Sequence, residues 1–306
     1  MSEPVIETKG LTKFFGGRCV VDELNLSIAR GSIFGFLGRN GAGKSTTIRL
    51  LLGLLEPTRG NSHVLGTDSL RLTPQDRARI GYLPEGHHVY GWMSVEECGR
   101  FQRSFYKSWN DDIFRAVLSH FRLDTKTKSG NLSRGQRAGL CLAMVLAPEP
   151  ELLILDDPAL GLDPVARRSL IQSMLFVTRK AERTILFSSH MLSDVERVAD
   201  EIAVLDGGNL RASCSLETFR QQVRQISLRH GSIPIELPKL NGLLQTFRTE
   251  GEISLTIANL DKAEEEALRA LPGVSFEEVQ LGLEEAFIAY VGERGEKSFF
   301  TTDLKG

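Results

Sequence analysis

A glycine-rich segment constrains the fold of this chain more than any other feature. Gly38 to Ser45 reads GRNGAGKS and matches the pattern GxxxxGKS. The compact apolar run Ser32 to Leu37 before it predicts a buried strand. After it, apolar residues from Ile48 to Leu55 recur at helical spacing, which predicts a helix packed on one face that stops before Pro57. A strand, a glycine loop and a helix in this order indicate an α/β fold with a phosphate-binding loop.

The residue types in this glycine loop (Gly38 to Ser45) explain how it would hold phosphate. Glycines let the backbone turn tightly enough to point successive N–H groups at phosphate oxygens, and the following helix N-terminus adds a favourable partial charge. Lys44 would reach the β- and γ-phosphates of ATP, and Ser45 would ligate Mg²⁺. The alternative is an ordinary glycine-rich turn with an exposed lysine, which the flanking strand and helix disfavour.

A second predicted strand ends in two carboxylates. Leu152 to Leu155 is a short apolar run that is followed directly by Asp156 and Asp157. Phosphoryl transfer on loops of this kind needs an acid at a strand end to hold the Mg²⁺ shell, and Asp156 fits that role. Asp157 would lie nearer the attacking water. Alone, such a sequence is more often a turn, but together with the glycine loop it favours binding of Mg²⁺ and ATP.

Short strands and helices alternate through the first two-thirds of the chain. Turn signals divide Val5 to Ile28 into short antiparallel strands. Thr184 to Phe187 and Ile202 to Leu205 are further apolar strands, and Val165 to Thr178 is a predicted helix. This alternation is typical of an α/β P-loop NTPase core with a mixed, mainly parallel sheet. An antiparallel β subdomain precedes it.

A helical subdomain is predicted inside this first domain. From Ser94 to Phe121 the pattern is helical and more polar, and Ser94 with Glu97 forms a candidate capping box at its start. We place the helical subdomain at about residues 86–150 of a nucleotide-binding domain that spans residues 1–219.

The last part of the chain has a different character. Alternating segments that begin at Ile226 and Ile253 predict half-buried strands, and Asp261 to Leu271 and Leu283 to Tyr290 predict helices. We therefore predict a small α+β C-terminal appendage over residues 220–306, which ends in a polar tail.

Composition limits the possible cellular location and binding partners of the chain. The chain has 37 Lys and Arg against 39 Asp and Glu, so no overall field would draw it to nucleic acid. No apolar run approaches the roughly 18 residues needed to cross a bilayer, and the first residues do not resemble a signal peptide. The widely spaced cysteines form no CxxC pair, which fits a reducing cytosol. We predict a cytoplasmic protein that reaches a membrane only through a partner.

A further motif carries a resemblance to a known family. Leu132 to Gln136 reads LSRGQ, which is similar to the LSGGQ signature of ATP-binding cassette (ABC) proteins, and it precedes the paired acids as in that family. In motif order the resemblance covers about Val5 to Leu216. The segments around Asp156 and His190 most resemble the exporter branch, the ABC-2-like proteins with separate membrane subunits.

The resemblance implies a role for individual residues. Phe15 matches the aromatic residue that stacks on adenine, Glu85 the Q-loop glutamine and His190 the switch histidine. Ala159 to Asp163 resembles the D-loop. Taken singly, Phe15, Glu85 and His190 would more often be structural or solvated residues, but their order and spacing favour the functional interpretation.

The complete set of candidate site residues follows from the motifs and the resemblance. The catalytic candidates are Lys44, Glu85, Asp157 and His190. The candidate Mg²⁺ ligands are Ser45, Glu85 and Asp156. The candidate ATP-binding residues are Phe15, Gly38, Arg39, Asn40, Gly41, Ala42, Gly43, Lys44, Ser45, Thr46, Asp156, Ser133, Arg134, Gly135 and Gln136.

Three of these residues depart from the family pattern. Asp157 replaces a customary glutamate, so its carboxylate is one methylene shorter, and hydrolysis should slow by up to about 100-fold. Arg134 stands at a glycine position of the signature, where it could crowd the nucleotide of an opposing subunit or add a favourable charge. Glu85 replaces glutamine, as it often does in exporter-type relatives. We expect slow but real hydrolysis.

Two neighbouring features have weaker interpretations. His87 and His88 are adjacent and have no spaced Cys, Asp or Glu partner, so they are interpreted as loop residues and not as a metal site. Tyr90, Trp92 and Met93 precede the predicted helices of the helical subdomain, where the family docks its membrane partner. A partner contact is slightly favoured over simple packing.

These features predict the ATP-hydrolysing subunit of an exporter that acts through separate transmembrane permease subunits. It would pair with a second ABC cassette, as a homodimer or a heterodimer, and lie on the inner face of the cell membrane. One alternative is a soluble, non-transport ABC ATPase, whose usual second cassette or long coiled coil is not seen in this sequence. The other is a cassette that senses ATP with little turnover.

Overall fold

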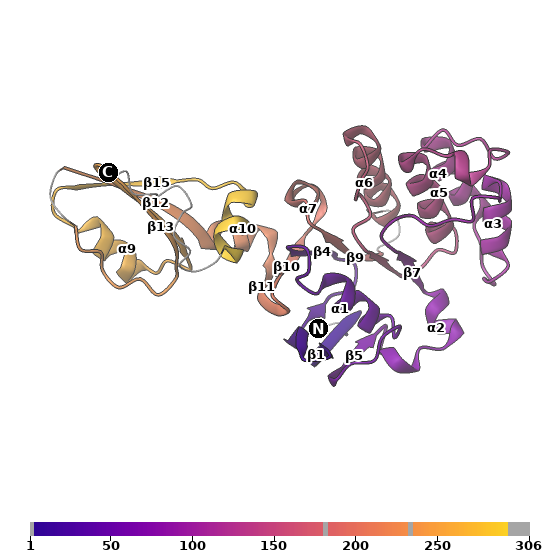
Figure 1. Ribbon diagram of the computed structural model, residues 1–306, viewed down its shortest axis with the longest axis horizontal. Coiled ribbons are helices and arrows are strands. Elements are labelled where there is room, and N and C mark those ends of the chain that lie inside the picture. Colours follow the sequence, from indigo (N-terminus) through magenta and orange to yellow (C-terminus); the bar gives the residue numbers. More distant parts are fainter. Residues whose placement is uncertain (1–2, 180–182, 232–234, 293–306) are drawn as a thin grey trace. The chain divides into compact units, whose positions relative to one another are not determined.

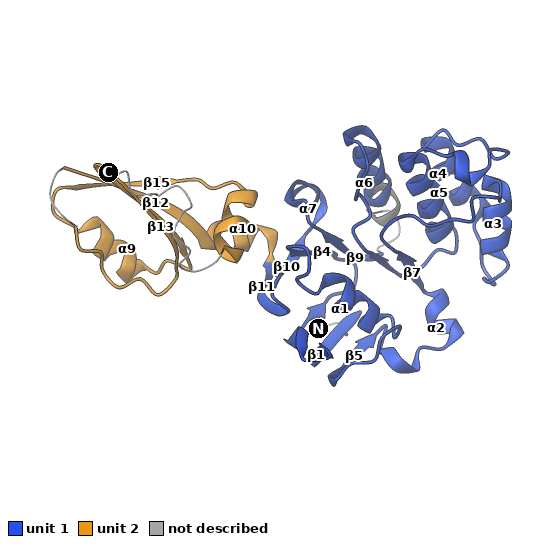
Figure 2. Cartoon of the chain, in the orientation of Figure 1, with its two compact units in different colours: residues 1–214 blue, residues 215–306 orange. Residues whose placement is uncertain are grey.

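The computed structural model describes residues 3–179, 183–231 and 235–292 of the chain. The chain divides into two compact units, residues 1–214 and 215–306, which are coloured separately in Figure 2. Each unit has a hydrophobic core of its own. Within the described residues, no helix is both long enough and apolar enough to cross a membrane.

A six-stranded sheet runs through the first unit in the order β11-β10-β4-β9-β8-β7 (Figure 1). Its strands are β4 (Ile33–Gly38), β7 (Ile80–Leu83), β8 (Leu152–Leu155), β9 (Thr184–Ser189), β10 (Glu201–Asp206) and β11 (Asn209–Ser215). All neighbouring pairs from β10 to β7 are parallel. Every residue of β4, β8 and β9 is buried, as expected for parallel strands that are covered on both faces. The prediction of a mainly parallel sheet is confirmed.

The order of these strands brings three sequence motifs to one edge of the sheet. Strands β4, β9 and β8 are neighbours and end at Gly38, Ser189 and Leu155. In open α/β sheets, ligands bind outside the carboxyl ends of the strands. The glycine loop, the paired acids and the candidate switch histidine each follow one of these strand ends, so they converge there.

An antiparallel sheet forms the N-terminal part of the same unit. Its strands are β1 (Ile6–Phe15), β2 (Arg18–Leu24), β3 (Ser27–Ile28), β5 (Arg59–Val64) and β6 (Thr67–Asp68). The first three confirm the antiparallel strands predicted between Val5 and Ile28. The apolar pattern does not predict β5, because this strand reads RGNSHV and its first half is exposed.

Helix α1 (Lys44–Leu51) begins inside the glycine loop and ends earlier than its apolar spacing predicts. The spacing predicts a helix as far as Leu55, but Gly53 has a φ of 62°. The N–H groups of Gly53 and Leu54 donate back to carbonyl oxygens of the last turn at 3.0 and 2.9 Å. This Schellman arrangement satisfies those carbonyl groups and ends the helix. The predicted end was therefore wrong, although Leu55 still packs against the core.

Three helices gather beside the central sheet (Figure 1). They are α3 (Val95–Arg103), α4 (Asp111–His120) and α5 (Arg134–Leu146). The capping box predicted at the start of α3 is confirmed, because Ser94 Oγ accepts from the Glu97 N–H at 3.2 Å and Glu97 Oε2 accepts from the Ser94 N–H at 2.6 Å. A Cβ at Gly139 of α5 would lie 2.3 Å from Phe121 Cγ, so the close packing of α5 on the end of α4 requires glycine.

Three further α-helices lie in the described part of the first unit. They are α2 (Pro74–Ala78), α6 (Pro164–Arg179) and α7 (Leu192–Val198). Helix α6 lies between β8 and β9 in the chain and confirms the crossover helix predicted over Val165 to Thr178. Asp163 caps its start, because Asp163 Oδ1 accepts from the N–H groups of Val165 and Ala166 at 2.9 and 3.0 Å.

The second unit contains a four-stranded antiparallel sheet in the order β13-β14-β12-β15. Its elements are α8 (Leu216–Gln222), β12 (Val223–His230), β13 (Leu243–Thr249), β14 (Glu252–Ala258), α9 (Lys262–Arg269), β15 (Val274–Val279) and α10 (Leu283–Val291). The strands around Ile226 and Ile253 and both C-terminal helices agree with the predictions. The pattern does not predict β13 and β15, whose residues are mostly exposed. The predicted polar tail lies outside the described residues.

Candidate functional site

The glycine loop has a backbone that only glycine can adopt easily. Gly41 and Gly43 have φ angles of 81° and 105°, in the left-handed region that side chains disfavour. A Cβ at Gly43 would lie 2.5 Å from the Val20 carbonyl oxygen, and one at Gly38 would lie 2.5 Å from the Leu205 carbonyl oxygen. The glycines therefore set both the turn and its close approach to neighbouring strands.

Lys44 folds back across the loop that precedes it. Its side chain is buried, and Nζ donates to the carbonyl oxygens of Gly38 and Arg39 at 2.6 and 3.2 Å. Burial lowers the pKa of Lys44, and the negative charges of Asp157, Asp156 and then Glu85 oppose that shift. The ammonium group therefore lies within the field of the acids that the sequence assigned to the same site.

Asp156 is held by two hydroxyl groups. Its Oδ1 accepts from Ser45 Oγ at 3.0 Å and from Ser188 Oγ at 2.8 Å. The Asp157 N–H in turn donates to Ser188 Oγ at 2.9 Å. The glycine loop, the end of β8 and the end of β9 are thus linked through one buried carboxylate. Ser188 is not among the predicted site residues, and its place before the candidate switch histidine was the signal for it.

Asp157 and His190 form a close pair next to this group. His190 Nδ1 lies 2.6 Å from Asp157 Oδ2. Burial raises the pKa of Asp157, while the hydrogen bond and charge of His190 and the charge of Lys44 act in the opposite direction. Asp157 also has a φ of 44°, a conformation that Asp tolerates better than most residues. The pair is therefore a fixed feature at the carboxyl edge of the sheet.

Glu85 and Phe15 are less tightly held than the residues above. Glu85 follows β7 and is exposed, and its charge reaches Lys44. Phe15 ends β1 with half of its surface exposed, and Lys13 Nζ lies 5.3 Å from the centre of its ring. An exposed aromatic ring at this position is available for stacking, so the adenine-binding role of Phe15 stays a prediction.

The signature segment, Leu132 to Gln136, forms the start of α5. Ser133 is its N-cap, where Ser133 Oγ accepts from the Gln136 N–H at 3.2 Å and Gln136 Oε1 accepts from the Ser133 N–H at 3.1 Å. A Cβ at Gly135 would lie 2.6 Å from Ala166 Cβ. Among the described residues, no hydrogen bond or ion pair joins this segment to the glycine loop or to the paired acids.

Arg134 extends toward the segment that resembles the D-loop. The side chain is exposed, and a Cβ placed at Gly161 would lie 3.4 Å from Arg134 Nη1. Gly161 has a φ of 72°. The guanidinium group therefore lies beside this loop of its own chain, a placement that the sequence could not predict.

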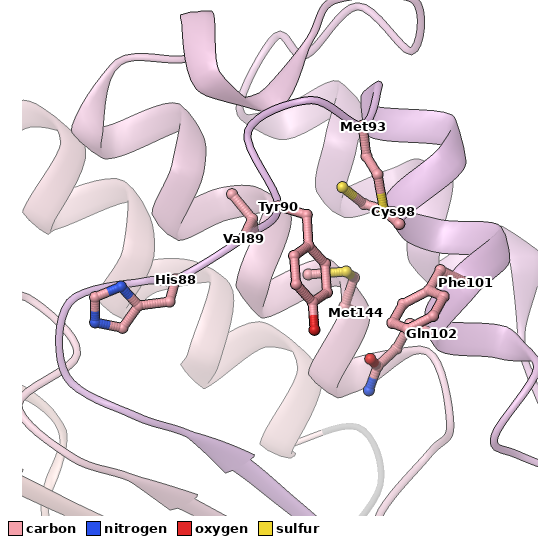
Figure 3. Close-up of a pocket in the computed structure, with 8 residues that line it drawn as sticks. All are labelled: His88, Val89, Tyr90, Met93, Cys98, Phe101, Gln102 and Met144. Carbon is pink, nitrogen blue, oxygen red and sulfur yellow. The ribbon is translucent and has the colours of Figure 1, made fainter.

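An apolar groove lies on the face formed by α3, α5 and the loop before α3 (Figure 3). It has a volume of about 300 Å³. It is lined by His88, Val89, Tyr90, Met93, Cys98, Phe101, Gln102 and Met144. The Tyr90 and Phe101 rings meet edge to face with centroids 5.7 Å apart. Tyr90 and Trp92 are exposed by 57% and 69%, whereas Met93 is buried.

The two adjacent histidines lie in a loop, as predicted, but differ in their surroundings. His88 is exposed and lines the apolar groove. His87 is buried, which lowers the pKa of its imidazole, while the neighbouring Pro158 backbone acts in the opposite direction. Its burial between the loops after β7 and β8 was not visible in the sequence.

Comparisons with known proteins identify the family. Residues 21–160 match the family model described as ABC transporter. The chain is 34% identical to the bacitracin transport ATP-binding protein BcrA of Bacillus licheniformis over 72% of this chain and 73% of that protein. It is 32% identical to the Nod factor export ATP-binding protein I of Rhizobium sp. (strain N33) over 97% of this chain and 100% of that protein.

The solved structures agree with this result. A structure of the ATP-binding subunit of an ABC transporter covers 71% of this chain and 92% of its own, with 30% identity and a TM-score of 0.64. A dimeric bacterial ABC transporter cassette, MJ0796, is 21% identical, covers 69% of this chain and 98% of its own, and has a TM-score of 0.63, which supports the fold. The predicted P-loop ATPase fold is confirmed. The chain belongs to the family of ABC transporter ATP-binding proteins.

Proposed function

We propose that this chain hydrolyses ATP slowly and thereby powers export through separate membrane permease subunits. The observation that carries the proposal is the linked group at the carboxyl edge of the sheet. There Ser45 of the glycine loop donates a hydrogen bond to Asp156. The next residue, Asp157, contacts His190. This arrangement combines phosphate binding, a metal-binding carboxylate and a positioned acid.

The residues that face each other beside Lys44 fit Mg²⁺. Ser45 Oγ and Asp156 Oδ1 are hard oxygen donors 3.0 Å apart, and Mg²⁺ prefers such donors together with phosphate oxygens and water. No group of three or more His, Cys, Asp or Glu side chains suited to a metal occurs in the described part of the chain. Ser45 and Asp156 would hold the ion together with nucleotide phosphates and water, and the ion would supply positive charge against the phosphates.

Asp157 and His190 would position the attacking water. Asp157 Oδ2 is engaged by His190 Nδ1, which leaves Oδ1 to accept a hydrogen bond from water. His190 fixes the orientation of the carboxylate, and Lys44 holds the transferred phosphoryl group. Because the Asp157 side chain is short, we expect the water to be held less closely and turnover to be slow.

A second cassette would complete each site. The start of α5 presents backbone N–H groups and Ser133, which suits a γ-phosphate at a helix N-terminus. In the described part of the chain, no bond joins these groups to the glycine loop, which supports their use by a second cassette in a homodimer or heterodimer. The dimeric cassette among the similar structures is consistent with this assembly.

The apolar groove beside α3 is the proposed docking surface for a permease. Its exposed aromatic side chains Tyr90 and Phe101, and Trp92, whose ring centroid lies 6.1 Å from that of Tyr90, are of the kind enriched at protein interfaces. A short amphipathic helix from a permease loop would bury these rings. Two relatives are named for bacitracin transport and Nod factor export, which supports export by this chain from the cytoplasmic face of the membrane.

Membrane fractionation tests this proposal. The chain is co-expressed with its candidate permease, and the fraction recovered with membranes is compared for wild type, Tyr90→Ala/Phe101→Ala and Phe247→Ala. Phe247 is a matched control, because it is 53% exposed and belongs to the second unit. We expect wild type and the control to pellet with membranes and the double variant to stay in the supernatant with ATP binding intact. Equal recovery of all three proteins would argue against the docking surface.

A further inference from the structure

A second cavity lies at the start of α5, and its lining residues differ from those of the apolar groove. It has a volume of about 290 Å³. Three loops or helix ends of the same chain meet there, and the lining residues are Gly86, His87, Arg134, Arg137, Leu160, Gly161 and Leu162. The lining contains two guanidinium groups and no carboxylate. Its electrostatic character therefore favours an anion.

His87 contributes a buried polar atom that has no partner. The residue is only 5% exposed. Its imidazole lies beside the Pro158 backbone, and its Nε2 is buried without a hydrogen-bond partner. Such an atom costs free energy unless something fills the cavity and bonds to it. A ligand hydroxyl group that donates to Nε2 would satisfy it.

The two arginines add a second unsatisfied group and two unpaired charges. Arg137 Nε is buried without a hydrogen-bond partner. Among the described residues, neither Arg134 nor Arg137 forms an ion pair, and the only bond of Arg137 is a long one of 3.4 Å from Nη2 to the Leu132 carbonyl oxygen. Both side chains belong to the first turns of α5, whose positive end favours anions.

We propose that this cavity binds free inorganic phosphate, at a site separate from the glycine loop. A tetrahedral oxyanion offers several acceptor oxygens to the two guanidinium groups, and its hydroxyl group can donate to His87 Nε2. The ligand is the product of the proposed ATPase reaction, so the physiological source rests on the proposed function. Binding itself needs only this chain, because every lining residue belongs to it.

The site links the product to three functional segments. His87 follows the Q-loop position at Glu85, Arg134 belongs to the signature segment, and Gly161 lies in the segment that resembles the D-loop. Bound phosphate would hold these segments together after cleavage. Its departure would release them.

Phosphate binding to the Lys44→Ala protein tests the inference, because this change disables phosphate binding in the glycine loop. The nucleotide-free protein is titrated with inorganic phosphate and followed by the ³¹P line width. We expect saturable millimolar binding that weakens about tenfold or more in Arg137→Gln, because one charge-assisted contact is lost. His87→Leu should behave similarly. Arg115→Gln is the control, since Arg115 is exposed on α4 and also removes one positive charge.

Unchanged binding in correctly folded Arg137→Gln and His87→Leu, judged by circular dichroism, would overturn the site. Broadening that appears only with ATP present would mean that the phosphoryl group of a second cassette is the ligand, and would overturn binding of free phosphate. Phosphate binding without ATPase activity would contradict the proposed function alone, whereas ATPase activity without phosphate binding would contradict this inference alone.

Discussion

His190 Nδ1 lies 2.6 Å from Asp157 Oδ2, so the residues proposed as the switch histidine and the catalytic acid are in direct contact. One oxygen of the carboxylate is thus engaged by the histidine. The position of the other oxygen is fixed by a side chain one methylene shorter than glutamate. The pair explains how the acid is oriented and why its reach is limited.

Replacing Asp157 with glutamate should therefore speed hydrolysis. The longer side chain brings its carboxylate nearer the water, and we expect kcat to rise by about tenfold to 100-fold, since 1 Å of misplacement can cost that much. Glutamate tolerates the φ of 44° less well than Asp, so stability should fall by up to about 1 kcal/mol. Steady-state phosphate release measures the effect. Asp157→Asn is the control and should remove activity, and a glutamate variant no faster than wild type would contradict the role of Asp157.

Alanine substitutions at two similar serine N-caps can distinguish an effect on stability from an effect on ATPase activity. Ser133 and Ser94 form the same capping box at the starts of α5 and α3. Replacing either with alanine should cost about 1 kcal/mol of stability. Only Ser133→Ala should also lower ATPase activity by more than about tenfold, through the loss of one donor to the γ-phosphate. Urea unfolding and phosphate release are measured on both variants. Equal activity of the two would show that Ser133 acts only as a cap.

Glu151 predicts a pH dependence of stability. It accepts hydrogen bonds from Arg79 at 2.6 and 3.1 Å and from Arg30 at 3.1 Å, and the Arg79 bond is the main reason why its pKa is lowered from 4.5. The pKa of Glu151 is lower in the folded protein than in the unfolded chain. The ion pairs of Glu151 therefore stabilise the fold at a pH above the unfolded-state pKa, and this stabilisation is lost as the pH falls through the folded-state pKa.

The Glu151→Gln variant tests whether stability depends on pH in this direction. At pH about 7 we expect a loss of roughly 0.5 to 1 kcal/mol in the free energy of unfolding, a small value because the Glu151 side chain is 39% exposed. The difference from wild type should shrink below pH about 4 as the carboxylate is protonated. Glu56→Gln, which removes the same charge from an acid with no ion pair in the described structure, is the control. A difference independent of pH would refute the assignment.

Local features of this fold were predictable because their causes are local. The capping box at Ser94 and the acids after Leu155 depend on residues that are adjacent or a few positions apart. The helix predicted to reach Leu55 was too long because apolar spacing ignores the left-handed conformation that Gly53 adopts to end α1. Strand β5 escaped prediction because its pairing with β1, and not its own pattern, makes it a strand.

The parts of the site that could not be predicted depend on distant contacts. His87 reads as a loop residue until Pro158 is placed against it. The direction taken by Arg134 depends on Gly161 in another loop. The motifs therefore predicted the residues around the glycine loop. The second cavity could be found only in the folded structure, because its lining comes from segments far apart in the sequence.

We propose that this chain cleaves ATP with its own glycine loop. Lys44 Nζ bonds the loop carbonyls at Gly38 and Arg39 and lies within the field of the paired acids, so Lys44→Ala should remove binding and cleavage of the γ-phosphate together. The most direct measurement is the rate of phosphate release from Mg²⁺ and ATP by the purified wild-type and Lys44→Ala proteins. We predict a slow wild-type rate that exceeds the variant rate by about 100-fold or more. Indistinguishable rates would contradict the account.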